Sequence, residues 1–197
     1  MKIVVFGATG RVGRAVVEQG LARGHEITAF VRSPARLDRA EAPGLTVVLG
    51  DASDPASVAA AIPGHDAVIS ALGVATMEET TELSTMNANV VEGAKAANVS
   101  SVVAVVSAAV FFETSRPPFQ FVGEEHRRDL ATLRASGLDW VGAAPGTITD
   151  DDALGSYQDE LDAPAPGAEI TRFDLADFLL DAVETDAFVG HAVGLSN

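Results

Sequence analysis

The sequence predicts an α/β fold, a doubly wound parallel sheet with a small C-terminal cap. Apolar β-branched segments alternate along the 197 residues with segments of helical periodicity, which is typical of a parallel sheet covered by helices on both faces. The apolar segments are nearly continuous, as in strands that are buried on both faces. We expect one domain over residues 1–197, in which about 146–197 form the cap.

The elements follow from short-range signals in chain order. The expected strands are apolar runs that end at a glycine, a proline or a polar residue: 2–7, 25–32, 45–51, 66–73, 101–107, 138–145 and a closing strand at 191–195. The expected helices have apolar residues three or four apart: 11–24, 33–40, 54–62, about 80–97, 123–137 and 174–185. Ser33-Pro34 begins the second helix, Asp54 caps the third, and Gly24 and Gly137 end the first and fifth.

Composition excludes several classes of protein. The net charge of −15 argues against a nucleic-acid partner. The absence of cysteine excludes disulfides and thiolate metal sites. No apolar run approaches the roughly 18 residues of a membrane helix, and no leader precedes the first strand, so we expect a soluble cytoplasmic protein. Only Lys2 and Lys95 of the 13 cations are lysines. A halophilic source would explain this acidic, arginine-rich composition, and a GC-rich genome is the alternative.

Three glycines, Gly7, Gly10 and Gly13, lie between the first strand and the first helix. Glycines in this position let the backbone approach a phosphate closely, and the helix N-terminus offers unpaired N–H groups to it. Thr9 and Arg11 can add a hydroxyl group and a cation. The context therefore predicts a dinucleotide site of the Rossmann type, with an ordinary structural turn as the alternative.

The end of the second strand indicates which dinucleotide binds. NAD-binding proteins usually place an acidic residue there for the ribose hydroxyl. This chain instead has Arg32, with Arg36 one helical turn later. Two guanidinium groups suit a 2′-phosphate, so we predict NADP(H). The alternative is a pair of solvated loop arginines.

Other strand ends supply further candidate contacts. Asp51 ends the third strand and is placed to accept a hydrogen bond from adenine, or else to cap the local turn. Ala71, Leu72 and Gly73, at the end of the fourth strand, are expected along the cofactor. Ser107 ends the fifth strand, where a hydroxyl group can orient a substrate carbonyl or the nicotinamide amide, or else complete the turn.

The motifs GATGRVG, GHEITAFVRSPARL, VVLGD, DAVISALG, VVSAAVF and LRASGLDWVGAAPG resemble the atypical short-chain dehydrogenase/reductases. Within these, the chain is most similar to the biliverdin reductase B / flavin reductase type and to NmrA-like proteins. The resemblance covers about residues 1–195 and implies NAD(P)H binding. It implies cofactor contacts at Gly7, Thr9, Gly10, Arg11, Val12, Gly13, Arg32, Arg36, Asp51, Ala52, Leu72, Gly73, Ser107 and Pro145, and an active-site serine at Ser107.

The chain departs from the family in its acid–base residues. Many short-chain dehydrogenases use a Tyr-x-x-x-Lys pair, and here that stretch is VGEEH, Val122 to His126. The remaining candidates are His126, as a proton donor or as an ordinary helix histidine, and Tyr157, as a lid over a substrate ring or as packing of the cap. The acidic run at 149–152 is expected to be a solvated loop, not a metal site.

Two functions fit these observations. The first is an NADPH-dependent oxidoreductase that transfers hydride to a flat conjugated small-molecule acceptor such as a flavin or a quinone. The second is a non-catalytic NADP(H) sensor. An isoflavone-type reductase is a third possibility, for which the cap is short. We expect a monomer or a weak homodimer.

Overall fold

The computed structural model describes residues 1–34, 41–74, 76–114 and 118–197. Its main sheet has the strand order β3-β2-β1-β4-β5-β6-β10-β8. The strands are β1 (Lys2–Phe6), β2 (Glu26–Val31), β3 (Leu45–Leu49), β4 (Ala67–Ser70), β5 (Ser101–Val105), β6 (Asp139–Pro145), β8 (Gln158–Leu161) and β10 (Ala192–Ser196). Within the described ranges β8 pairs antiparallel with β10, and every other pair of neighbours in this sheet is parallel.

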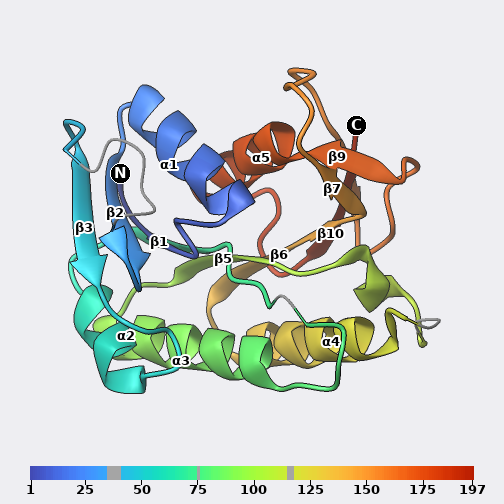
Figure 1. Cartoon of the computed structure of the whole chain (residues 1–197), viewed down its shortest axis with the longest axis horizontal. Helices are drawn as coiled ribbons and strands as arrows, with labels where there is room; N and C mark the ends of the chain where they lie inside the picture. The colour runs from blue at the N-terminus through green and yellow to red at the C-terminus, as the bar shows by residue number, and fades with distance from the viewer. Residues whose placement is uncertain (35–40, 75, 115–117) are drawn as a thin grey trace.

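Helices cover both faces of the sheet, which confirms the predicted fold class (Figure 1). Helices α1 (Arg11–Ala22) and α5 (Arg172–Glu184) pack together on one face, and α2 (Pro55–Ala61), α3 (Glu82–Ala97) and α4 (Gln120–Ala135) lie on the other. Strand β1 shows why two cores result. Ile3 and Val5 belong to the apolar cluster beneath α1 and α5, whereas Val4 and Phe6 belong to the opposite cluster. The two-residue period of a strand thus feeds both layers.

Local capping explains the helix boundaries. The Asp54 side chain accepts a hydrogen bond from the backbone N–H of Ala56 (3.1 Å) and caps α2. Thr171 caps α5 by accepting from the N–H of Asp174 (3.0 Å). Gly24 and Gly137, with φ of +83° and +73°, follow α1 and α4 closely. The predicted helix at 33–40 lies mostly outside the described residues.

Residues 146–197 supply elements of the main sheet and its helical layer as well as a separate small sheet. Helix α5 and strands β10 and β8 extend the central layers, and Phe178, Leu179 and Leu180 are fully buried. A separate two-stranded parallel sheet joins β7 (Thr147–Thr149) to β9 (Glu169–Thr171). No helix in the described part of the chain is long and apolar enough to cross a membrane.

Candidate functional site

A groove opens at the carboxyl edge of the sheet, where the strand order reverses. From β1 the chain builds outward through β2 and β3, and then returns to place β4 on the other side of β1. The loops that follow β1 and β4 therefore diverge, which is where open α/β sheets bind ligands. The groove has a volume of about 390 Å³ and is lined by Gly7, Thr9, Gly10, Phe30, Val31, Arg32, Gly50, Asp51, Ala52, Ala71, Leu72, Gly73, Glu82 and Met86.

The predicted glycine loop forms a turn that admits no side chains at two positions. Gly7 has φ of +75°, and a Cβ there would lie 2.3 Å from the carbonyl oxygen of Ala71. A Cβ on Gly13 would lie 2.1 Å from the carbonyl oxygen of Gly7. Helix α1 therefore packs directly on the turn, and a hydrogen bond from the N–H of Gly10 to the carbonyl oxygen of Gly7 (2.8 Å) closes it.

The start of α1 has the features of an anion site. Among the described residues, Gly10 is its N-cap and makes no side-chain capping bond, and no acidic residue lies in the first turn. The first N–H groups of α1 thus lie beside a groove, without a side-chain acceptor and at the positive end of the helix dipole. A glycine turn packed this tightly, next to N–H groups without a side-chain acceptor, can serve as a cradle for the pyrophosphate of a dinucleotide.

Arg32 and Asp51 both line the groove, and the charge of Arg32 acts on the Asp51 carboxylate. The Asp51 carboxylate accepts hydrogen bonds from the N–H (2.9 Å) and hydroxyl (2.7 Å) of Ser53. These bonds, assisted by the charge of Arg32, hold the pKa of Asp51 below its ordinary value. Asp51 therefore caps its turn and also lines the groove. Arg36, the second predicted arginine, lies outside the described residues.

Arg11 has a partner that the sequence did not reveal. Its guanidinium donates to Asp150 Oδ2 (3.1 Å), and Arg172 donates to the other oxygen of the same carboxylate. These two cations hold the pKa of Asp150 below its ordinary value. The acidic run at 149–152 is thus partly engaged by arginines. Among the described residues no group of His, Cys, Asp and Glu side chains could hold a metal ion.

The predicted substrate-side residues do not line the groove. The Ser107 hydroxyl accepts from the N–H of Ala109 (3.3 Å) and begins the short helix η2 (Ala108–Phe111). Pro145 ends β6. The Tyr157 hydroxyl donates to Asp181 (2.5 Å), and its ring lies edge-on to Phe178. Burial and the Asp181 bond raise the pKa of Tyr157. These contacts suit the packing interpretation of Tyr157, while the roles of Ser107 and Pro145 remain predictions.

His126 lies in α4 at the position of the missing lysine. Burial lowers its pKa to about 4, so the ring is neutral at physiological pH. Its Nδ1 atom is enclosed and has no hydrogen-bond partner among the described residues. His126 is therefore not an imidazolium donor, and any proton it gives must come from a neutral ring.

Several groove residues were not singled out from the sequence: Phe30, Val31, Gly50, Glu82 and Met86. Three of them, Phe30, Val31 and Gly50, lie close to predicted contacts at strand ends, and this adjacency was the available signal. Glu82 and Met86 come from the start of α3, and only the tertiary structure brings that helix to the groove.

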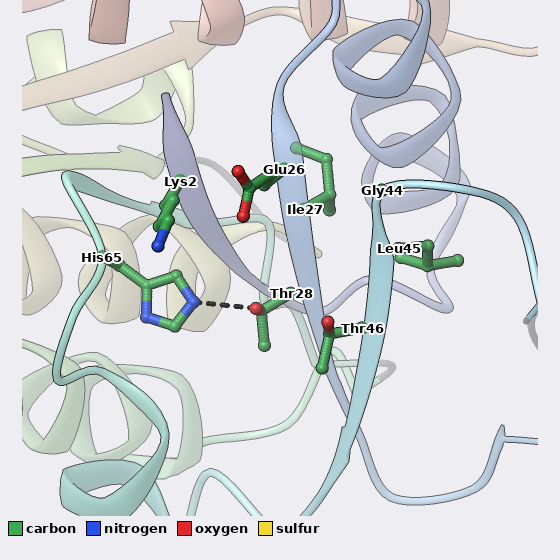
Figure 2. A pocket seen from close by; sticks show the side chains of 8 residues that line it. All are labelled: Lys2, Glu26, Ile27, Thr28, Gly44, Leu45, Thr46 and His65. Carbon is green, nitrogen blue, oxygen red and sulfur yellow. Dashed lines mark hydrogen bonds between the residues drawn. The ribbon is translucent and has the colours of Figure 1, made fainter.

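A second hollow, of about 220 Å³, lies at the opposite edge of the sheet (Figure 2). Its residues include the first residues of three strands, Lys2, Glu26 and Leu45. His65 faces into it, but both ring nitrogens are engaged, by the carbonyl oxygen of Ile62 (2.9 Å) and the hydroxyl of Thr28 (2.7 Å). These bonds explain His65 as a structural residue.

The fold and the groove define an α/β protein of the Rossmann type, built to hold a dinucleotide at its switch point. A family model described as NAD(P)H-binding matches residues 7–186. The chain belongs to this NAD(P)H-binding family.

Known relatives agree with this family. An isoflavone reductase homolog of Zea mays is 42% identical over 80 residues, which cover 36% of this chain and 26% of the relative. Quinone oxidoreductase 2 of Escherichia coli is 31% identical over 99 residues, 49% of this chain and 33% of the relative. The chain thus spans about a quarter to a third of the length of these relatives.

Solved structures share the whole fold. A short-chain dehydrogenase/reductase (wide type) from Veillonella parvula, crystallised in complex with NADP, superimposes with a TM-score of 0.83 at 17% identity. The alignment covers 100% of this chain and 94% of that one. At this level of identity the likeness shows the fold.

Proposed function

We propose that the protein is an NADPH-dependent oxidoreductase of the flavin reductase type, which transfers hydride to a flat conjugated acceptor such as a flavin or a quinone. The observation that carries this proposal is the groove, which is lined both by Gly7 and Gly10 of the glycine loop and by Arg32. The structure with NADP and the name of the E. coli relative support the cofactor and the class of acceptor.

The pyrophosphate and the adenosine end of the cofactor have residues suited to hold them. The N–H groups at the start of α1 and the Thr9 hydroxyl would bind the pyrophosphate. Arg32 is exposed and would bind the 2′-phosphate, and Asp51 keeps an oxygen available for adenine. When bound, the nicotinamide supplies hydride, and the protein supplies orientation and a site shielded from water.

The missing Tyr-x-x-x-Lys pair favours this class of acceptor. Interconversion of ketones and alcohols needs a dedicated general acid and base. At the family's tyrosine and lysine positions this chain has Val122 and a neutral His126. A reduced flavin or quinone is a weaker base than an alkoxide and tolerates a weaker proton donor. A small-molecule acceptor and a cytoplasmic site of action belong to the same proposal.

The test is NADPH oxidation, followed by absorbance, with free FMN and with a soluble quinone, at low and at multimolar salt. We expect turnover with NADPH to exceed turnover with NADH. Arg32→Ala should reduce that preference by at least tenfold, because a charge-assisted pair to phosphate contributes roughly 1.5–3 kcal/mol. Arg134→Ala, which removes an exposed arginine at the end of α4, is the matched control.

Turnover that persists in Arg32→Ala with an unchanged preference would contradict the assignment of Arg32. Folded protein that binds NADPH but reduces neither acceptor at either salt concentration would refute the enzyme and favour the sensor.

A further inference from the structure

A chain of buried polar side chains runs behind the groove wall from β4 through α3 to α4. The Ser70 hydroxyl donates to Asn87 Oδ1 (2.5 Å), and the Asn87 amide donates to Asp129 Oδ2 (2.6 Å). The three residues are 1%, 2% and 0% exposed. Ser70 directly precedes the groove residue Ala71, and Asn87 directly follows the groove residue Met86. This row of hydrogen-bonded side chains is therefore adjacent to the cofactor groove at two points.

At the α4 end of this row, two enclosed polar atoms are unpaired. Asp129 Oδ1 and His126 Nδ1 both lack a hydrogen-bond partner among the described residues. Residues three apart on a helix lie on the same face. One unpaired buried atom costs about 1–3 kcal/mol. A proton on Asp129 Oδ1 that is shared with His126 Nδ1 through one water molecule would satisfy both atoms.

The charges around the pair favour its neutral form. Glu125, one turn before Asp129 on α4, is already bound by the backbone N–H of Ser84 (2.8 Å) and by Arg128 (2.8 Å). From α3 and β4 the groups bonded toward Asp129 are the uncharged Asn87 and Ser70. Burial, together with the charge of Glu125, raises the pKa of Asp129 to about 7, although the Asn87 bond opposes it. Near neutral pH, Asp129 thus holds a proton in a large fraction of molecules.

Helix α4 contacts the segment that follows β5, where the substrate is expected. Helix α4 packs along η2, which follows Ser107. Arg127, next to His126, donates to the carbonyl oxygens of Ala109 and Phe112 (3.1 Å each). His126 as a residue is only partly buried, whereas its Nδ1 is enclosed.

We propose that Asp129 and His126 form a proton relay that completes the reduction of the acceptor. This inference rests on the proposed function. His126 Nε2–H gives its proton to the acceptor after hydride has arrived, while His126 Nδ1 takes the proton of Asp129 Oδ1. Asp129 acts through His126 and is a positioning and proton-storing residue.

The balance of the step explains why the pair is needed. The hydride comes from the bound nicotinamide, which is oxidised, and the acceptor gains one hydride and one proton. A neutral imidazole is a very weak acid unless its other nitrogen gains a proton at the same time. After the step His126 is again neutral, with its proton on Nδ1, and Asp129 is a carboxylate. A proton from solvent then binds His126 Nε2, and the proton on Nδ1 moves back to Asp129.

Asp129→Asn separates proton transfer from hydrogen bonding. An amide at this position keeps an oxygen for Asn87 and an N–H for His126 Nδ1, but it has no transferable proton. Glu124→Gln, which removes an exposed carboxylate from the same helix, is the matched control. Both variants should melt cooperatively, which shows that they are folded.

The first readout is NMR of the ring nitrogens in protein labelled with 15N-histidine. We expect the Nδ1 signal of His126 to shift as the pH crosses about 7, the pKa of Asp129, without protonation of the ring. This shift should persist in Glu124→Gln and vanish in Asp129→Asn. A signal that shows no inflection, or that shows a proton fixed on Nδ1 at all pH values, would refute the pair whether or not the protein turns over.

The second readout is turnover. Asp129→Asn should lower kcat at least tenfold and change the solvent deuterium isotope effect, with KM for NADPH within twofold of the parent. Parental kcat in Asp129→Asn would refute proton delivery by the pair. An absence of turnover in the parent itself would refute the proposed function and with it the delivery step, and the NMR result would still decide whether Asp129 and His126 are coupled.

Discussion

Substitution of Gly13 by alanine tests whether the turn before α1 is the cofactor cradle. The added Cβ would lie 2.1 Å from the carbonyl oxygen of Gly7, 2.7 Å from its carbonyl carbon and 2.9 Å from Ala8 Cα. All three are backbone atoms, so no side chain can rotate out of the way. The first turn of α1 must move by about 1 Å to reach ordinary contact distances.

The expected cost follows from two opposing effects. Overpacking against a rigid neighbour costs roughly 1–3 kcal/mol, and the gain in helix propensity from glycine to alanine returns about 1 kcal/mol. We expect a net loss of about 1–2 kcal/mol in the free energy of unfolding, or a Tm lower by roughly 2–8 °C. Because the N–H groups of α1 move with the helix, NADPH affinity should fall at least tenfold.

Gly20→Ala is the control within the same helix. Its Cβ would meet the Cδ1 atom of Ile27 at 2.8 Å, the end of a side chain that can adjust. Stability should stay within about 1 kcal/mol of the parent, and NADPH affinity should be unchanged. Thermal unfolding by circular dichroism and titration of NADPH fluorescence measure both quantities. Parental NADPH affinity in Gly13→Ala would refute the assignment of the cradle.

Two further predictions concern buried carboxyl groups. The Asp174 carboxylate accepts from the N–H groups of Leu154 and Gly155, the hydroxyl of Thr171 and the amide of Asn197, so Asp174→Ala should lower the free energy of unfolding by on the order of 3 kcal/mol. Proteolysis of the 150–157 loop should also become faster, and a parental Tm would contradict this role. The second prediction is an effect of pH on stability. Burial raises the pKa of Asp129 to about 7, so between about pH 4 and 6.5 the native state holds a proton there that the unfolded state has lost. Burial lowers the pKa of His126 to about 4, so over the same range the native state lacks a proton there that the unfolded state holds. These two effects oppose each other in the parent, and each variant retains only one of them. In urea unfolding, the free energy of unfolding should therefore rise with pH in Asp129→Asn by on the order of 3 kcal/mol, and fall with pH in His126→Gln by a similar amount. Parallel pH profiles in the parent and the variants would refute this prediction.

The local features of the fold could be predicted because each has its cause in neighbouring residues. Strands buried on both faces are apolar throughout, and the glycine loop is required by contacts within a few residues of itself. The fifth strand ends at Val105 instead of 107, because Ser107 turns the chain into η2. Strand β8 has the sequence QDEL and is exposed along its whole length, so no pattern of hydrophobicity marked it.

The groove was predictable where strand ends define it, and not where distant segments meet. Nothing near Arg11 in the sequence indicates Asp150, 139 residues away. Asp129 was missed for a different reason. His126, Asp129, Leu130 and Leu133 have the i, i+3, i+4, i+7 spacing of one helix face, and the two leucines are buried. That spacing placed both polar residues toward the interior, and it was the signal that could have identified the pair.

The protonation states of this pair also bear on the proposed reaction. Reduction of the acceptor requires an acid that gives up a proton as hydride arrives, and the reverse reaction requires a base that takes one up. A His126 ring with a pKa of about 4 holds an extra proton poorly, so neither task falls to an imidazolium ion. Asp129, with a pKa of about 7, is present near neutral pH both as the acid and as the carboxylate, so the pair can give up its proton and regain it there. The pair thus suits proton transfer at neutral pH in either direction, and the hydride donor of the proposed function, NADPH, sets the reducing direction.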